Sequence, residues 1–310
     1  MTHSSHLSHV EQERRLFGMV LRLIAMAVVS VMFASVKLVE TRGVNLVETI
    51  FFRQLFALMP VTAWIAFTSG LSAVKTQRIG AHMSRTAMGL TGMSINFWGY
   101  ILLPLAEATT IGFTMPMFAT ILSALVLKEK TGIHRWSAVV LGFIGVLVMV
   151  RPDGAHFPLL GASVSLAAAF MTACISIMLR QLGKTEGAAV TVFWFTLLSL
   201  PPLGVLMIFF AQPHDLVTWG ILLLMGLTGG LAQLCMTGAL RWAPVSVVLP
   251  MDYSSILWAT LLGWLFWNQW PLATTWIGAM LIIASGFYIA WRERIRLQRL
   301  RANMTGDALG

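Results

Sequence analysis

The stretch Met88-Gly89-Leu90-Thr91-Gly92 occurs a second time, unchanged, as Met225-Gly226-Leu227-Thr228-Gly229. The same register, an offset of 137 residues, pairs Asn96 with Gln233. Registers at offsets of 142 and 140 residues also align identical residues: Thr49/Thr191, Pro60/Pro202, Ala119/Ala259 and Trp136/Trp276. Because the three registers agree to within five residues, the sequence predicts a duplication that gives two similar halves in one chain.

The composition indicates that both halves lie in a membrane. Apolar residues make up 57% of the 310 positions and charged residues 11%, whereas a soluble domain carries about 25% charged residues. The apolar residues form runs long enough to cross about 30 Å of hydrocarbon. We therefore predict an all-α, polytopic membrane protein with ten transmembrane helices, at 17–36, 47–67, 86–103, 107–127, 136–150, 158–179, 188–211, 217–239, 245–267 and 272–291.

Five spans in each half is an odd number, so the second copy enters the membrane inverted relative to the first. Inverted repeats are typical of transporters in which a midplane site opens to alternate sides. We expect four segments: a cytoplasmic tail at 1–16, a first repeat at 17–151, a second repeat at 157–291 and a basic cytoplasmic tail at 292–310. The chamber is expected between spans one to four and six to nine, with the fifth and tenth spans outside it and facing lipid.

The basic residues indicate the orientation. With both termini in the cytoplasm, 17 of the 21 Lys and Arg residues lie in cytoplasmic segments and only Lys37, Arg42 and Arg151 lie opposite. The positive-inside rule then places both termini on the cytoplasmic side of a bacterial inner membrane. In this position the net charge of +9 anchors the chain near anionic lipid, and no nucleic-acid partner is expected.

The sequence lacks the motifs of ATP hydrolysis and of common enzymes, such as a P-loop, HExxH, CxxC or G-x-S-x-G. We therefore expect no catalytic residue, no metal and no cofactor, and a protein that is not an enzyme. Gradient-driven transport of a small molecule is the favoured function. The expected partners are this substrate and the lipid bilayer, and the expected state is a monomer.

Two charged residues inside the predicted spans are candidate substrate contacts. Arg53 is costly to place in a bilayer and suits bidentate recognition of a carboxylate; pairing with Glu107 or Glu48 is the structural alternative. Asp252 lies beside Pro250 in span nine and could neutralise a substrate ammonium, carry a proton or fix the kinked backbone. A direct Arg53–Asp252 ion pair is not expected, because the two residues enter their spans from opposite surfaces.

Polar and aromatic residues complete the predicted site. Asn96 and Gln233 occupy equivalent positions in the two halves and suit either interhelical hydrogen bonds or substrate contacts. An aromatic wall for an apolar side chain is expected from Trp98, Tyr100, Phe113, Trp194, Tyr253 and Trp258, although single members could instead pack or face lipid. Kinks that shape the cavity are expected at Pro60, Pro116 and Pro250.

Several short motifs resemble the EamA family of the drug/metabolite transporter superfamily. The first copy carries Phe52-Arg53-Gln54-Leu55, Leu105-Ala106-Glu107-Ala108 and Lys128-Glu129-Lys130, and the second carries Leu249-Pro250-Met251-Asp252-Tyr253. Within the family the chain is similar to YddG-type exporters of aromatic and other amino acids. The resemblance implies amino acid export by alternating access, with uptake of a cofactor-like metabolite such as S-adenosylmethionine or riboflavin as the alternative.

Overall fold

The computed structural model describes residues 2–126, 132–150, 158–183, 185–243 and 245–307, and its regular structure there is entirely helical. The motif Lys128-Glu129-Lys130 and the predicted loop residue Arg151 lie outside these ranges. The elements are α1 (Thr2–Glu40), α2 (Leu46–Thr68), η1 (Leu71–Val74), α3 (Ile79–Leu102), α4 (Leu105–Gly112), α5 (Met115–Leu125), α6 (Ile133–Val150), α7 (Leu159–Leu182), α8 (Ala188–Phe210), α9 (Leu216–Trp242), α10 (Val245–Val248), η2 (Leu249–Ser254), α11 (Ser255–Trp267) and α12 (Ala273–Asp307).

The predicted membrane fold is confirmed. Among the described residues, eight segments are long and apolar enough to cross a bilayer, and one of them is the broken pair α4–α5. The other two predicted spans correspond to α3 and to α10–η2–α11. Polar residues such as His82 and Arg85 reduce the apolar character of α3, and the 3-10 turn at Leu249–Ser254 interrupts the last of these segments.

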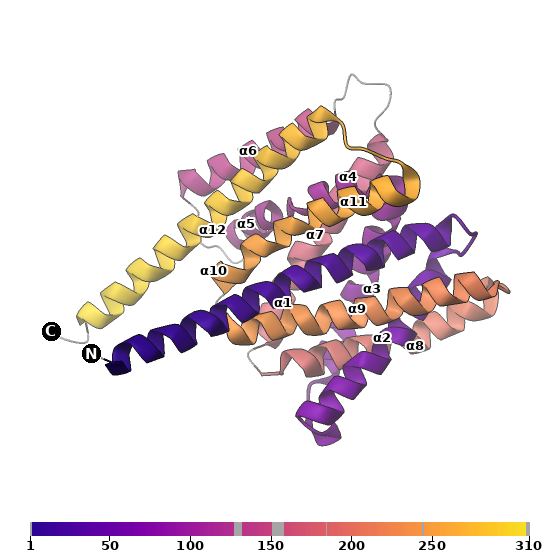
Figure 1. Cartoon of the computed structure of the whole chain (residues 1–310), viewed down its shortest axis with the longest axis horizontal. Helices are drawn as coiled ribbons and strands as arrows, with labels where there is room; N and C mark the ends of the chain where they lie inside the picture. The colour runs from indigo at the N-terminus through magenta and orange to yellow at the C-terminus, as the bar shows by residue number, and fades with distance from the viewer. Residues whose placement is uncertain (1, 127–131, 151–157, 184, 244, 308–310) are drawn as a thin grey trace.

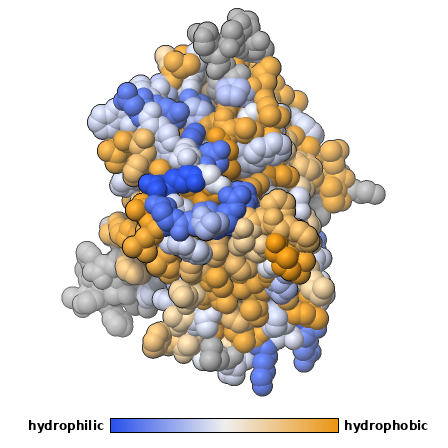
Figure 2. Space-filling model, turned by 90° about the vertical axis from the view of Figure 1, so that its right-hand side faces the viewer, coloured by the Kyte–Doolittle hydropathy of each residue, from blue (hydrophilic) through white to orange (hydrophobic). Residues whose placement is uncertain are grey.

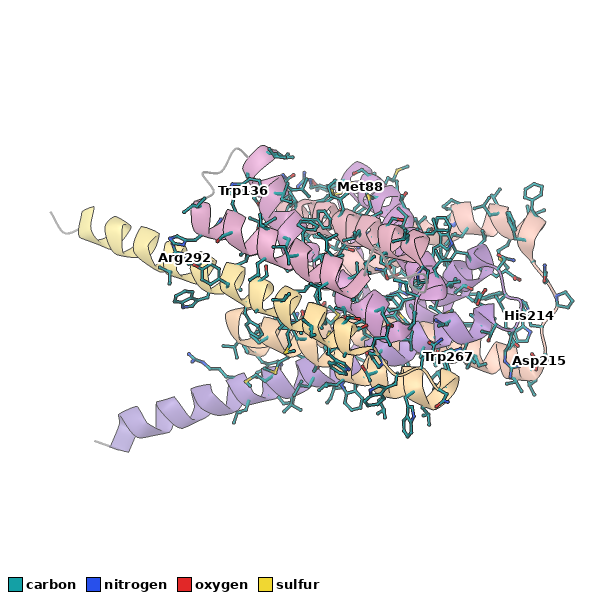
Figure 3. The ribbon with its side chains drawn as sticks, turned by 90° about the horizontal axis from the view of Figure 1, so that it is seen from above. Met88, Trp136, His214, Asp215, Trp267 and Arg292 are labelled. Atoms are coloured by element: carbon teal, nitrogen blue, oxygen red, sulfur yellow. The ribbon has the colours of Figure 1, made fainter. Side chains whose placement is uncertain are left out.

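Both termini lie at one end of the helical bundle (Figure 1), which we call the terminal side, and the opposite end is the far side. Trp136 and Arg292 lie toward the terminal side, whereas His214, Asp215 and Trp267 lie toward the far side (Figure 3). The helices α1 and α12 extend into the segments predicted as tails. These extensions contain neither Gly nor Pro from 2 to 17 and from 287 to 305, so nothing in the sequence ends the helices at the predicted boundaries.

The contact between α6 and α12 shows the internal two-fold symmetry. A Cβ atom added to Gly145 would lie 2.9 Å from the Gly278 carbonyl oxygen. The symmetry-equivalent pair, found by exchanging positions at the offset of 140 residues, is Ala138 with Ser285, and Ser285 Oγ donates to the Ala138 carbonyl at 2.5 Å. A contact that recurs with its partners exchanged is the mark of a two-fold interface.

The helices α6 and α12 lie side by side at one edge of the molecule (Figure 1). Only their outer faces are exposed, because Gly142 is buried and Ile282 is 0% exposed between the two helices. The expectation that both helices simply face lipid was therefore wrong for their inner faces. Periodicity indicated their apolar character but not which apolar side chains face the partner helix.

The two halves interlock elsewhere through matching contacts. The helix α1 packs on α9 as α7 packs on α3, and α2 packs on α9 as α8 packs on α3. Glycines permit these close approaches: a Cβ atom on Gly226 would lie 2.4 Å from Phe56 Cβ, and one on Gly92 would lie 2.7 Å from Ile175 Cδ1. Seen from the far side, hydrophilic residues cross the middle of the face and hydrophobic residues surround them (Figure 2).

Candidate functional site

Arg53 lies between the two halves, on α2. Asn45 caps this helix by accepting from the Glu48 amide, and Arg53 follows about two turns later, about 10 Å along the helix axis from the far side. Its Nε lies against α9, where a Cβ atom on Gly229 would be 3.0 Å away. Arg53 Nη1 donates to Gln54 Oε1, and within the described residues Nε has no hydrogen-bond partner. Glycine at 229 thus leaves room for a guanidinium group at the interface.

The two carboxylates considered as structural partners of Arg53 are engaged elsewhere. Glu48 is fully buried and its Oε1 accepts from the Gln212 amide at 2.9 Å, with His214 Nε2 at 3.2 Å. Glu107 Oε1 accepts from Thr275 Oγ1 at 3.4 Å. Pairing of Arg53 with either residue was therefore a wrong alternative.

Arg85 is a second buried arginine, and the sequence interpretation missed it by assigning it to a cytoplasmic loop. It lies on α3 with only 9% of its surface exposed, and its Cζ stands 3.9 Å from the Phe195 ring centroid on α8. In the described part of the chain its Nε and Nη1 have no hydrogen-bond partner. Arg53 reaches the same part of α8 through Gln54, whose Nε2 donates to Ser199 Oγ one turn after Phe195, so two like charges lie beside this helix. The available signal was Gly89 one turn after Arg85, which leaves space for the side chain.

Polar residues of α2, α3 and α8 surround the arginines. Gln54 Nε2 donates to Ser199 Oγ at 2.9 Å and joins α2 to α8. His82 is fully buried on α3, with Nε2 3.9 Å from Glu186 Oε2. Trp194 donates from Nε1 to the Val74 carbonyl at 2.8 Å. Trp194 therefore fastens α8 to the turn between α2 and α3, which adds a positioning role to its predicted substrate contact.

Asp252 lies on η2 and forms an ion pair with Arg22 of α1. Arg22 Nε donates to Asp252 Oδ1 at 2.5 Å and Nη2 donates to Oδ2 at 2.7 Å. The sequence interpretation treated Arg22 only as a topology charge, although it lies within α1 and is 6% exposed. Of the three roles considered for Asp252, this geometry favours fixing the backbone of the interrupted span.

The remaining predicted residues are distributed over several places. Phe113 and Tyr253 meet with ring centroids 4.9 Å apart; they are equivalent at the offset of 140 residues and each lies at a helix interruption. Tyr100 is buried and stacks on Phe33 at 3.8 Å. Trp98 and Trp258 are 44% and 40% exposed. Asn96 and Gln233 are half-buried on α3 and α9.

The three prolines differ in what they do to the backbone. Pro116 begins α5 directly after the break that separates it from α4, and Pro250 lies inside the 3-10 turn η2. The helix α2 runs unbroken through Pro60. The helices are thus interrupted at Pro116 and Pro250, two of the three positions where kinks were predicted, and α2 continues through the third, Pro60.

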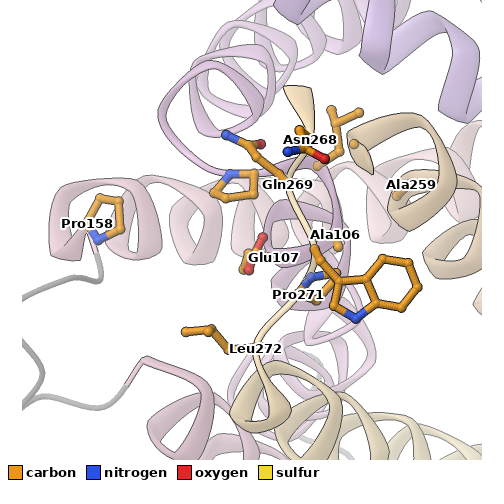
Figure 4. Close-up of a pocket in the computed structure, with 12 residues that line it drawn as sticks. Ala106, Glu107, Pro158, Ala259, Asn268, Gln269, Pro271 and Leu272 are labelled. Atoms are coloured by element: carbon orange, nitrogen blue, oxygen red, sulfur yellow. The ribbon is translucent and has the colours of Figure 1, made fainter. Parts of the chain in front are cut away.

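A cavity of about 330 Å³ opens near the far side between α4, α11 and the 268–272 loop (Figure 4). Its wall includes Glu107, whose Oε2 has no hydrogen-bond partner among the described residues. Lys37 donates from Nζ to the carbonyl of Leu103, just before α4, at 2.6 Å. None of the predicted site residues lines this cavity.

The sequence model of the EamA-like transporter family matches the chain twice, at residues 16–151 and 159–291. The chain belongs to the EamA-like transporter family. This protein is accordingly a membrane transporter of a small metabolite and not an enzyme. In the described part of this EamA-like chain, no group of three or more His, Cys, Asp or Glu residues could hold a metal ion.

Named relatives of this EamA-like chain transport different metabolites. A riboflavin transporter of Vibrio cholerae is 30% identical, over 74% of this chain and 77% of that protein. The pseudopaline exporter CntI of Pseudomonas aeruginosa is 28% identical, over 86% of this chain and 94% of that protein. An S-adenosylmethionine uptake transporter of Rickettsia prowazekii is 25% identical, over 80% and 83%. Both export and uptake occur among these relatives.

One solved crystal structure resembles the EamA-like fold over 90% of this chain and 97% of its own, with a TM-score of 0.60 and 18% identity. At this identity the likeness concerns the arrangement of the helices alone. It agrees with the polytopic architecture described above.

Proposed function

We propose that this transporter exports amino acids, aromatic and other apolar ones included, or related small carboxylate-bearing metabolites across the bacterial inner membrane. Both termini are on the cytoplasmic side, so the terminal side is the cytoplasmic one. Transport proceeds by alternating access of a chamber bounded by α1–α5 and α7–α11, with α6 and α12 outside it. The excess of Lys and Arg on the terminal side supports this orientation.

Arg53 is the single observation that carries the substrate assignment. An arginine within an apolar span costs about 2.5–3.5 kcal/mol on insertion scales, and a pairing acidic side chain would offset that cost. Within the described residues Arg53 has only the neutral Gln54 as a hydrogen-bond partner. A planar guanidinium group left open at the contact between halves suits the carboxylate of a transported molecule.

The ammonium group of an amino acid requires a different contact from the one first expected. Asp252 is compensated by Arg22, so it binds a substrate ammonium only in a state in which Arg22 has released it. Asn96 and Gln233 lie at equivalent positions of the two halves. Their amide oxygens are neutral groups that can accept hydrogen bonds from the substrate ammonium inside the chamber. Arg53 therefore binds the substrate carboxylate, and the substrate ammonium has no permanent charged partner.

Uptake of a cofactor-like metabolite is the second candidate. It is supported by the names of the relatives from Vibrio cholerae and Rickettsia prowazekii, a riboflavin transporter and an S-adenosylmethionine uptake transporter. The half-buried residues Phe113 and Tyr253, whose rings meet at 4.9 Å, offer apolar aromatic surface to a ring system.

A counterflow screen in proteoliposomes separates the two candidates. Vesicles containing the purified protein are preloaded with one unlabelled compound and exposed to the same compound in radiolabelled form, with and without a pH gradient. Accumulation of labelled amino acids supports the proposal. Accumulation of riboflavin or S-adenosylmethionine alone would replace it with the second candidate. Protein-free vesicles give the background.

A further inference from the structure

Two arginines lie beside the same stretch of α8, and within the described residues neither forms an ion pair with an acidic side chain. Arg53 of α2 donates from Nη1 to Gln54 Oε1, and Gln54 Nε2 donates to Ser199 Oγ of α8 at 2.9 Å. One turn earlier on α8, the ring of Phe195 lies 3.9 Å from Cζ of Arg85, which comes from α3. The buried carboxylates of the described chain pair elsewhere: Glu48 with His214, Glu186 with Thr76 and His82, Glu107 with Thr275, and Asp252 with Arg22. The interface therefore holds two positive charges that repel each other at low dielectric.

The surrounding residues keep Arg85 in this position rather than letting it reach water. Phe195 presents its ring face to the guanidinium at 3.9 Å, a cation–π contact that leaves the N–H donors at the edge of the group open. Gly89 lies beside Arg85 Nη1, and a Cβ atom there would also stand 2.6 Å from Phe195 Cε2. The Arg85 side chain is thus 91% buried, and its Nε and Nη1 have no hydrogen-bond partner in the described chain.

We infer that Arg53 and Arg85 together form a site for a small dianion, which carries either two carboxylates or one phosphate. Each guanidinium group donates to one side of the anion, since its planar fork matches both carboxylate and phosphate oxygens. Without a ligand the two positive charges repel each other. A dianion neutralises both of them, so its second negative charge contributes to binding. The inference rests on the proposed function in one respect, because it narrows the substrate class of the Arg53 site.

Binding to the purified full-length protein in lipid nanodiscs tests this site. Isothermal titration calorimetry at constant ionic strength compares L-aspartate with L-asparagine, which has the same shape and lacks one negative charge, and adds glycerol 3-phosphate as the phosphate arm. We expect aspartate or glycerol 3-phosphate to bind at least about tenfold more tightly than asparagine, because hydrogen bonds to charged groups contribute about 1.5–3 kcal/mol. Equal affinity for all three compounds would overturn the inference.

Variants assign the preference to the arginine pair. Arg85→Gln should abolish the preference for the dianion, whereas Arg78→Gln should retain it. Arg78 is the matched control, since it lies just before α3, is exposed and donates to Thr185 Oγ1 at 2.7 Å. If Arg85→Gln does not fold, Gly89→Ala keeps the charge and displaces the guanidinium, and it should lower the preference. An undiminished preference in the variant that folds contradicts the inference.

Binding and transport can fail separately. If the protein prefers the dianion but shows no counterflow of any amino acid, the result supports the two-arginine site and contradicts the proposed function. If the protein shows counterflow of amino acids but binds aspartate and asparagine with equal affinity, the result supports the proposed function and contradicts the dianion site.

Discussion

Arg22 on α1 and Asp252 on η2 join the two halves of the transporter through two parallel hydrogen bonds, with donor–acceptor distances of 2.5 and 2.7 Å. The pair lies near the terminal side, where Phe17 also meets Trp242 of α9 at 5.3 Å. A Cβ atom on Gly18 would lie 2.7 Å from Ala243 Cβ, so the backbones approach closely here as well. In this conformation α1 is fastened to the second half on the terminal side, and alternating access requires these contacts to open.

Breaking the pair should destabilise the protein. Because Arg22 is nearly buried and Asp252 is 29% exposed, Asp252→Asn should cost about 1–3 kcal/mol, at the lower end or below the range for fully buried pairs. The measurement is the shift in thermal unfolding of the purified protein in one detergent. Arg22→Gln combined with Asp252→Asn should recover part of the loss. Arg42→Gln is the control, since its pair with Asp215 is exposed, and it should leave the unfolding temperature unchanged. Equal shifts in unfolding temperature for Asp252→Asn and Arg42→Gln would contradict a stabilising role of the Arg22–Asp252 pair.

The close contact of α6 with α12 should not tolerate an added methyl group. A Cβ atom on Gly278 would lie 2.6 Å from the Gly145 carbonyl oxygen. We expect Gly278→Ala to destabilise the protein by about 1–3 kcal/mol through overpacking. Gly220→Ala is the matched helix substitution, because nothing lies within 4 Å of the added atom. The measurement is the thermal unfolding temperature of both variants. An unchanged unfolding temperature for Gly278→Ala would show that α6 and α12 separate freely.

Asp215 should contribute stability that depends on pH. Its hydrogen bond from Thr218 at the start of α9 lowers the pKa of the exposed carboxyl below the ordinary value of about 4. A lowered folded-state pKa gives stabilisation that is present above the unfolded value and is lost as the pH falls through the folded one. Wild type should therefore exceed Asp215→Ala in unfolding temperature at pH 7, and this difference should shrink toward pH 2. A constant difference across the range would assign the effect to something other than the charged carboxylate.

The orientation can be tested by labelling single cysteines in intact cells. In a background with Cys174 and Cys235 replaced, a cysteine at Thr41, in the exposed loop between α1 and α2, should react with a membrane-impermeant thiol reagent added outside. A cysteine at Thr305 near the end of α12 should react only after the cells are permeabilised. The reverse pattern would place the termini outside the cytoplasm.

The helical architecture was predictable because its signals lie within single segments. Long apolar runs predict spans, and the recurrence of Met88–Gly92 at Met225–Gly229 predicts the inverted halves. The breaks near Pro116 and Pro250 were also predictable, since proline removes a backbone donor. All of these features are visible in the sequence without knowing which helices pack together.

The charged contacts were not predictable in the same way, because they depend on which helix faces join. Arg22 and Arg85 lie near span ends, where a count of loop charges assigns both to the cytoplasm. Only the packing of α1 on η2 and of α3 on α8 shows that both are buried. The sequence alone likewise allowed three roles for Asp252: binding a substrate ammonium, carrying a proton or fixing the backbone. The ion pair with Arg22 favours the last of these.

Counterflow by Arg53 variants tests the central claim most directly. Proteoliposomes with equal amounts of inserted wild type, Arg53→Lys, Arg53→Ala and the exposed control Arg42→Gln are compared for uptake of the amino acid that wild type exchanges best. We predict that Arg53→Ala loses about tenfold or more in apparent affinity, since a charged hydrogen bond contributes about 1.5–3 kcal/mol, that Arg53→Lys is intermediate and that Arg42→Gln matches wild type. Wild-type rates and affinities in a folded Arg53→Ala would contradict the claim that Arg53 binds the substrate carboxylate.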